Sequence, residues 1–285
     1  MGKTQWKELK MTSKVTVTPS MIGMLTAMLM VLLSACATVP VTGRSQLALL
    51  PESEMVTLGQ QAYQQQLSEH PVSNQPGDVE PVLRVGKRLA AATEDFLRAN
   101  NLPTDVYQWE FSVIDNDEIV NATCLPGGKI VFYSGIFEYT KDDDGIATVM
   151  GHEIAHAIAR HGNERLSQAL LIELGAASLS EAMASQPART RELASQAFGL
   201  TANFGVALPF NRSRESEADR IGLTLMAKAG YDPRKAVEFW ERFSQAGAKV
   251  PEFLSTHPSG TTRIADIQAH LPEALQHYTG AYKVK

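Results

Sequence analysis

Residues 151–161 read GHEIAHAIARH and lie inside a long helical pattern. His152 and His156 are four residues apart, so on a helix they lie about 40° apart in projection and one turn along the axis. Two imidazoles placed in this way can bind a single zinc ion. Glu153 lies about 100° further around the helix, where it can reach a water beside the metal without binding the metal. The spacing therefore predicts a zinc site with Glu153 as general base.

This HExxH pattern is moderately specific by itself, because five residues with three of them fixed also occur by chance. The alternative is a helix with two surface or core histidines. Val149, Ile154 and Ile158 make the helix apolar, which is typical of a helix that crosses a hydrophobic core. Buried histidines need polar partners, and a metal provides them.

A catalytic zinc needs three protein ligands and one open position, and residues 213–219, SRESEAD, offer the third ligand. Asp219 lies four residues after Glu215, on the same helical face, but about 160° away from Glu217. If Glu215 binds zinc, Asp219 can accept a hydrogen bond from the other ring nitrogen of a zinc-bound histidine, which such histidines usually require. We therefore expect Glu215 to be the ligand, Asp219 to hold the histidine, and Glu217 to be a solvated helix charge.

The N-terminal segment predicts a targeting sequence. A basic stretch precedes an apolar run at residues 21–33, which is short for a membrane span. The run ends in Leu-Ser-Ala-Cys at residues 33–36, which is typical of a bacterial lipobox. We expect residues 1–35 to be a lipoprotein signal peptide, Cys36 to be acylated, and residues 36–52 to be a tether. An ordinary signal peptide or a short anchor, with the cysteine there by chance, is the alternative.

The remaining residues, 53–285, predict one α+β domain that is mainly helical. Helical patterns occupy residues 53–68, 78–98 (with Asp78 as N-cap), about 143–165, and three stretches after residue 213. Residues 109–134 predict three short strands in an antiparallel meander, so that the HExxH helix packs on a small antiparallel sheet. Residues 166–208 predict helices that form a lid over the cleft, a membrane-facing hairpin or ordinary packed elements.

Charge and cysteine content narrow the choice of partners. The formal net charge is −5, and Lys3, Lys7, Lys10 and Lys14 against Glu8 give +3 in residues 1–35, which leaves −8 for the remainder. An acidic body argues against a nucleic-acid partner. Acylation of Cys36 would consume one of the two thiols and leave Cys124 unpaired.

Three segments carry a closer resemblance: GHEIAHAIARHGNERLSQ (151–168), LPFNRSRESEADRIGLTLMAKAGYDP (208–233) and FLSTHPSGTTRI (253–264). They resemble the gluzincin-type zinc metallopeptidase family that includes the heat-shock protease HtpX, the CAAX prenyl proteases, and the lipoprotein proteases BepA and LoiP. Within this family, the resemblance is strongest to the LoiP-type bacterial lipoproteins. The resemblance implies a gluzincin-like fold with one zinc per chain.

The resemblance also implies roles for other residues. Asn121 and Ala122 would lie on an exposed sheet edge beside the zinc, to which a substrate peptide could add by main-chain hydrogen bonds; a turn or bulge position is the alternative for Asn121. His257 would be an oxyanion donor, a resting fourth zinc ligand, or both, and a loop histidine that caps the next helix is the alternative. His161 lies about 140° from the metal face, so we expect it to be structural, and we expect Arg263 to anchor the His257 loop.

Two functions remain open. The first is a zinc endopeptidase of the bacterial envelope that hydrolyses misfolded or stalled envelope proteins. The second is a lipoprotein chaperone or assembly factor for outer-membrane proteins with low or latent protease activity. Glu153 favours the enzyme, because a structural zinc site has no use for a general base. The expected partners are unfolded envelope proteins, the membrane through Cys36, and the outer-membrane assembly machinery. By resemblance to enterobacterial-type lipoproteins, Ala37 in place of an aspartate after the cysteine implies the periplasmic face of the outer membrane rather than the inner membrane.

Overall fold

The structure is a computed structural model that describes residues 36–39, 42–174, 190, 192–193, 212–246, 257 and 262–280. The chain divides into two compact units, Met1–Cys36 and Ala37–Lys285, and the second unit holds every candidate site residue except Cys36. The predicted signal peptide and most of the predicted lid or hairpin at residues 166–208 lie outside the described residues. None of the described helices combines the length and the apolar character that a bilayer span requires.

The described part of the chain is mainly helical α+β, as predicted. Its helices are α2 (Glu52–Glu69), α3 (Pro76–Ala99), α4 (Phe137–Thr140), α5 (Asp143–Ile158), α6 (His161–Leu174), α9 (Arg212–Lys228), α10 (Lys235–Ala246) and α12 (Arg263–Leu275), with the short 3-10 helix η1 (Ser134–Ile136). Its strands are β1 (Cys36–Thr38), β2 (Ser45–Leu47), β3 (Glu110–Ile114), β4 (Ala122–Leu125) and β5 (Lys129–Tyr133).

The three-stranded sheet has the order β3-β5-β4, so the predicted antiparallel meander is wrong. Strand β4 pairs with β5 in antiparallel fashion, through a turn in which Gly127 and Gly128 have positive φ angles of 84° and 80°. Strand β3 pairs with β5 in parallel, with Glu110 opposite Lys129. The physical reason is burial: every residue of β5 is buried, and a strand covered on both faces takes the central position. Strand β4 is therefore an edge strand.

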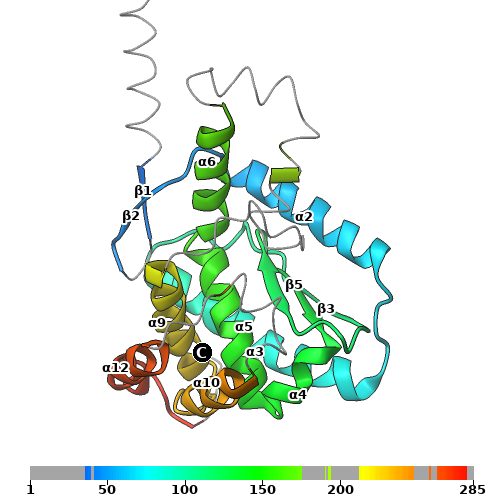
Figure 1. Ribbon diagram of the computed structural model, residues 1–285. Helices are drawn as coiled ribbons and strands as arrows, with labels where there is room; N and C mark the ends of the chain where they lie inside the picture. The colour runs from blue at the N-terminus through cyan, green and yellow to red at the C-terminus, as the bar shows by residue number, and fades with distance from the viewer. Residues whose placement is uncertain are drawn as a thin grey trace, which may run out of the picture. The chain divides into compact units, whose positions relative to one another are not determined.

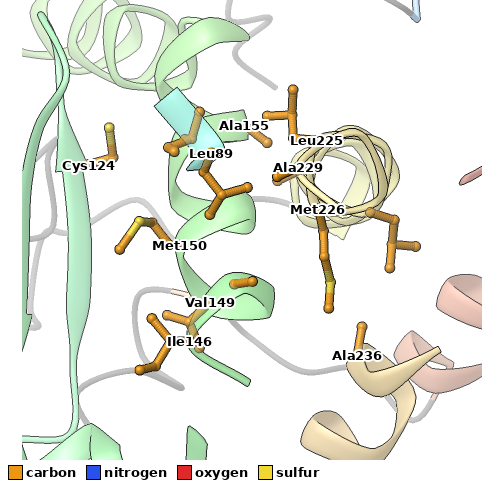
Figure 2. Close-up of a cluster of buried hydrophobic side chains, with 14 of the residues drawn as sticks. Leu89, Cys124, Ile146, Val149, Met150, Ala155, Leu225, Met226, Ala229 and Ala236 are labelled. Atoms are coloured by element: carbon orange, nitrogen blue, oxygen red, sulfur yellow. The ribbon is translucent and has the colours of Figure 1, made fainter. Parts of the chain in front are cut away.

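Helix α5 carries the HExxH residues through the middle of this unit. The side chain of Asp142 caps its first turn by accepting a hydrogen bond from the backbone N–H of Gly145 at 2.9 Å. Almost every residue of the helix is buried. Figure 1 shows the sheet on one side of α5 and α9 on the other. Figure 2 shows Met150 of α5 in the hydrophobic cluster that includes Leu89 of α3 and Met226 of α9.

Two glycines allow α5 and α9 to approach closely. A Cβ atom added at Gly222 of α9 would lie 2.9 Å from the backbone nitrogen of His152 and 3.0 Å from the carbonyl carbon of Gly151. Real Cβ contacts are longer than this, so a larger side chain at position 222 would push the helices apart. The glycine pair thereby brings Glu215, on the same helix, up to the histidines of α5.

The structure corrects two helix boundaries. The predicted helix at 143–165 is two helices, because Arg160 adopts a left-handed φ of 59° that ends the first and redirects the chain into the second. The predicted N-cap Asp78 lies inside α3, which begins at Pro76 after Gln75. Proline is well suited to the first helical position, and the carboxylate of Asp78 accepts a hydrogen bond from Ser73 Oγ at 3.0 Å.

Candidate metal centre

Four buried side chains bring their ligand atoms together. His152 and His156 of α5, Glu215 of α9, and His257 each offer one atom, and these atoms all lie within 4.8 Å of one another. The Nε2 atoms of the two α5 histidines are 3.1 Å apart. The carboxylate oxygens of Glu215 lie 3.4 Å from His156 Nε2 and 3.5 Å from His152 Nε2. Residues separated in the chain thus converge on a volume that one ion can fill.

The chemistry of these donors fits a cation. The Nδ1 atom of His152 faces Asp219 and that of His156 faces His161, so both rings turn their Nε2 atoms toward each other and toward Glu215. Glu215 Oε1 is buried without a hydrogen-bond partner among the described residues, which is costly for a carboxylate. A zinc ion would satisfy all three groups, since imidazole nitrogen and carboxylate oxygen are its usual ligands. His152, His156 and Glu215 therefore form a zinc site.

The Nδ1 side of the His152 ring, which faces away from the metal site, is held by Asp219. The Nδ1 atom lies 2.9 Å from Asp219 Oδ1, where the sequence analysis expected Asp219 to be. Burial acts to lower the pKa of His152, but Asp219 and Glu215 together raise it to about 9. With this raised pKa, His152 keeps an additional proton when no metal is bound. Zinc binding would displace this proton and release it to the solvent.

The structure also shows contacts of Arg263 that the sequence analysis did not predict. Its Nη2 donates to Asp219 Oδ1 at 2.8 Å and its Nη1 donates to Glu215 Oε2 at 3.1 Å. The guanidinium lies 3.4 Å from the centre of the Trp240 ring, a cation–π contact. Arg263 thus fixes the zinc ligand Glu215 and the acceptor Asp219 relative to each other. No local sequence pattern signals this contact, because Arg263 lies on α12, a different helix from either acid.

The expectation that Glu217 is a solvated charge is wrong. Its side chain is buried and accepts hydrogen bonds from Thr42 Oγ1 and from Arg44 Nε, the latter at 2.9 Å. Its other neighbour is His161, whose Nε2 lies 2.9 Å from Glu217 Oε2. The physical reason is that N-terminal residues cover the face of α9 on which Glu217 lies. His161 itself lies beside a zinc ligand, with its Nδ1 2.7 Å from His156 Nδ1.

Glu153 and His257 lie next to each other at the metal site. Glu153 Oε1 is 3.4 Å from His257 Nε2, and both side chains are buried. Burial raises the pKa of Glu153 to about 8, with His152 opposing and Glu215 reinforcing this shift. Burial lowers the pKa of His257 to about 3, so its imidazole is neutral. The His257 ring centroid lies 5.2 Å from those of both His152 and His156.

The remaining predicted residues lie on strands. Ala122 is buried in the edge strand β4, which packs against α5. Asn121 precedes that strand, where its backbone carbonyl accepts from Tyr133 N–H at 3.0 Å and its own Oδ1 accepts from Ala122 N–H at 2.9 Å. Cys36 begins β1, but its side chain lies outside the described residues, so its lipidation stays a prediction.

A peptidase family model and several known proteases match this chain. Residues 84–271 match the model for peptidase family M48. The chain is 41% identical over 174 residues to the mitochondrial metalloendopeptidase OMA1 of Schizosaccharomyces pombe, with 59% of this chain and 48% of that protein covered. It is 32% identical over 256 residues to the Saccharomyces cerevisiae OMA1, with 84% and 70% covered.

A bacterial relative is the beta-barrel assembly-enhancing protease of Escherichia coli. The chain is 31% identical to it over 237 residues, with 80% of this chain and 46% of that protein covered. The chain therefore spans about half the length of the Schizosaccharomyces and Escherichia relatives. The matched region contains the two histidines, the glutamate and the helices that hold them.

Proposed function

The chain belongs to peptidase family M48, and we propose that it is a zinc-dependent endopeptidase that hydrolyses unfolded or misfolded proteins of the bacterial envelope. The observation that carries the proposal is the buried carboxylate of Glu153, next in the chain to the zinc ligand His152 and 3.4 Å from His257. A zinc site built only for stability would gain nothing from a second, unliganded carboxylate at that position.

The chain's own groups suit peptide hydrolysis. Zinc held by His152, His156 and Glu215 would polarise the scissile carbonyl and make a water acidic. Glu153 would take a proton from the attacking water and pass it to the departing amine, a task for which its pKa of about 8 is well matched. The neutral His257 imidazole can donate an N–H to the oxygen that becomes negative. It can also bind the metal at rest, because its ligand atom lies within the same cluster.

The edge strand suggests how substrate binds. Strand β4 pairs on one side with β5 and packs against the helix that carries the zinc ligands. A substrate segment added along β4 would form main-chain hydrogen bonds, a mode that reads backbone rather than side chains. Asn121 and Ala122 would stand at the start of this edge. Only an unfolded segment has its backbone groups free for such pairing, which supports quality control as the role.

The cellular setting is part of the proposal. The lipobox at residues 33–36 supports attachment through Cys36 to the periplasmic face of the outer membrane. We propose outer-membrane β-barrel proteins as substrates and their assembly machinery as a partner, and the name of the Escherichia relative, a beta-barrel assembly-enhancing protease, supports the link to β-barrel assembly. The same name supports the second candidate, an assembly factor with low protease activity. We also propose, from the sequence motifs, that the chain is a lipoprotein protease of the LoiP type.

The test of the enzymatic role is cleavage of a purified, denaturant-unfolded outer-membrane protein, with the same protein folded in detergent as control. We expect the unfolded form to be cut at internal bonds, the folded form to be spared, and a chelator to stop cleavage until zinc is restored. Absence of cleavage by the zinc-loaded chain would leave the assembly factor as the better description.

The role of His257 is tested by His257→Ala in the same cleavage assay. The substitution should lower turnover by about 10²–10³-fold if His257 is an oxyanion donor, and should raise basal turnover if His257 is a resting zinc ligand. Unchanged turnover together with unchanged zinc affinity would exclude both roles.

The location has a separate test. Replacing Cys36 by serine removes the thiol that accepts the lipid, so we expect unprocessed or soluble protein in place of the membrane-bound form. Fractionation and labelling with a radioactive fatty acid measure this directly. Cys124→Ser is the matched control, because Cys124 is buried in β4 and should carry no lipid. Unchanged labelling of the Cys36 variant would contradict the lipobox.

A further inference from the structure

The two zinc-binding histidines are held in different ways. The Nδ1 atom of His152 meets a carboxylate directly, that of Asp219, at 2.9 Å. The Nδ1 atom of His156 meets another imidazole, that of His161, at 2.7 Å. The carboxylate that serves His156 acts through His161, because Glu217 Oε2 lies 2.9 Å from His161 Nε2. We call the series of His156, His161 and Glu217 the chain of contacts.

The proton positions along this chain of contacts are determined. His156 binds zinc through Nε2, so its Nδ1 carries the hydrogen and donates it. His161 Nδ1 must then be the unprotonated acceptor, and the proton of a neutral His161 sits on Nε2. That Nε2–H donates to Glu217, which as a carboxylate can only accept. Each bond has one donor and one acceptor, so His161 is fixed in one tautomer by Glu217 and in turn fixes the ring of His156.

The outer end of this chain of contacts is held by residues 42–50, which we call the N-terminal strap. Thr42 Oγ1 donates to Glu217 Oε1, and Arg44 Nε donates to Glu217 Oε2 at 2.9 Å. The two terminal nitrogens of Arg44 reach both carboxylate oxygens of Glu164 at 3.0 and 2.9 Å. Arg44 therefore places a full positive charge between two acids and keeps Glu217 an ionised acceptor.

The N-terminal strap is seated by further hydrogen bonds that do not touch this chain of contacts. Gln46 Nε2 donates to the Ala159 carbonyl at 2.9 Å, at the corner between α5 and α6. The backbone N–H of Leu49 donates to Ser167 Oγ at 2.9 Å. These hydrogen bonds position the strap on α6 and on the corner that precedes it. Their residues are suitable control positions because they lie outside the path to His156.

We propose that the N-terminal strap is a working part of the zinc site: Arg44 and Thr42, acting through Glu217 and His161, hold His156 in its zinc-binding orientation. All four are positioning residues, since none of them contributes an atom to the cluster of zinc-ligand atoms. The inference rests on the zinc site of the proposed function and not on the substrate. It assigns to residues just after Cys36 a role in metal binding that a tether would not have.

The experiment measures zinc affinity of the full-length chain by competition with a chromophoric chelator, and the visible absorption spectrum of the cobalt-substituted protein. His161→Phe keeps a ring but removes the acceptor, and Glu217→Gln keeps the shape but removes the charge. Both should weaken zinc binding by about 10–100-fold, the usual cost of losing a partner of a metal-bound histidine, and should shift the cobalt spectrum. Arg44→Gln, at a partly exposed side chain, should weaken binding by about tenfold.

Matched variants separate positioning from folding. Ser167→Ala loosens the strap without touching the chain of contacts and should leave zinc affinity and the cobalt spectrum unchanged. Thr42→Ser keeps the donating hydroxyl and should match the wild type, whereas Thr42→Val should bind zinc more weakly. The proposal is overturned if folded Glu217→Gln and Arg44→Gln proteins bind zinc as the wild type does, or if Ser167→Ala weakens binding equally. The readout is metal binding and not peptide cleavage. A protein that cleaves no peptide would contradict the proposed function, but its zinc affinity would still test this inference.

Discussion

Replacing Glu153 by glutamine should lower peptide-bond turnover by about 10²–10⁴-fold and leave zinc binding intact. The range is that of general acid–base catalysis, because glutamine cannot take a proton from water. The residue contributes no ligand to the group formed by His152, His156, Glu215 and His257. Glutamine has the shape of the carboxyl group, and a neutral amide avoids the cost of a buried charge, so the variant should also fold.

Turnover of an unfolded protein substrate and zinc content by elemental analysis would be measured on the same preparation. A thermal unfolding midpoint at or above that of the wild type would show that the fold is intact. Loss of zinc together with activity would instead make Glu153 a ligand. Retained activity would remove it from the chemistry altogether.

Replacing Glu215 by glutamine should weaken zinc binding by more than about 10²-fold, beyond the range for residues that only support a ligand. Glu215 is the one carboxylate in the donor cluster, so the change removes the negative charge that offsets the ion. It also removes one of the two carboxylates that form ion pairs with Arg263, which leaves more positive charge beside the metal.

Glu217→Gln is the internal comparison, since both residues are buried on α9 two positions apart. Competition with a chelator would rank the two variants, and the loss should be clearly larger for Glu215. If Glu217→Gln strips the metal and Glu215→Gln retains it, the ligand assignment has the two glutamates reversed. Equal losses would mean that the geometry of α9 as a whole, and not one ligand, governs binding.

The sequence predicts the centre of this site well because its rules are local. A spacing of four residues on a helix sets which side chains share a face, and this suffices for His152 with His156 and for Glu215 with Asp219. The same periodicity does not predict which residues cover the face of the helix on which Glu217 lies. Glu217 looked solvated for that reason, whereas its partner Arg44 comes from 173 positions away.

The errors in the sheet and in the long helix have a related cause. Strand partners depend on which strand is buried on both sides, and that depends on tertiary packing: β5 is buried throughout, with α2 packed on β4 and β5 and with α5 packed on β4. The helix break depends on Arg160, a residue type with good helix propensity that here adopts a left-handed conformation. That break turns His161 toward His156, and no periodic pattern could reveal it.

The helices that meet at Gly151 and Gly222 have a consequence for stability. The ligands at positions 156 and 215 stand 59 positions apart in the chain, so a bound ion closes a long loop much as a covalent cross-link would. An ion that binds only the folded chain adds to its unfolding free energy, by about 1.4 kcal/mol for each tenfold rise in free zinc above the dissociation constant. Persistence of the protein and its activity would then both follow the zinc supply of the compartment. When zinc is scarce, the chain would lose its chemistry and much of its resistance to degradation together.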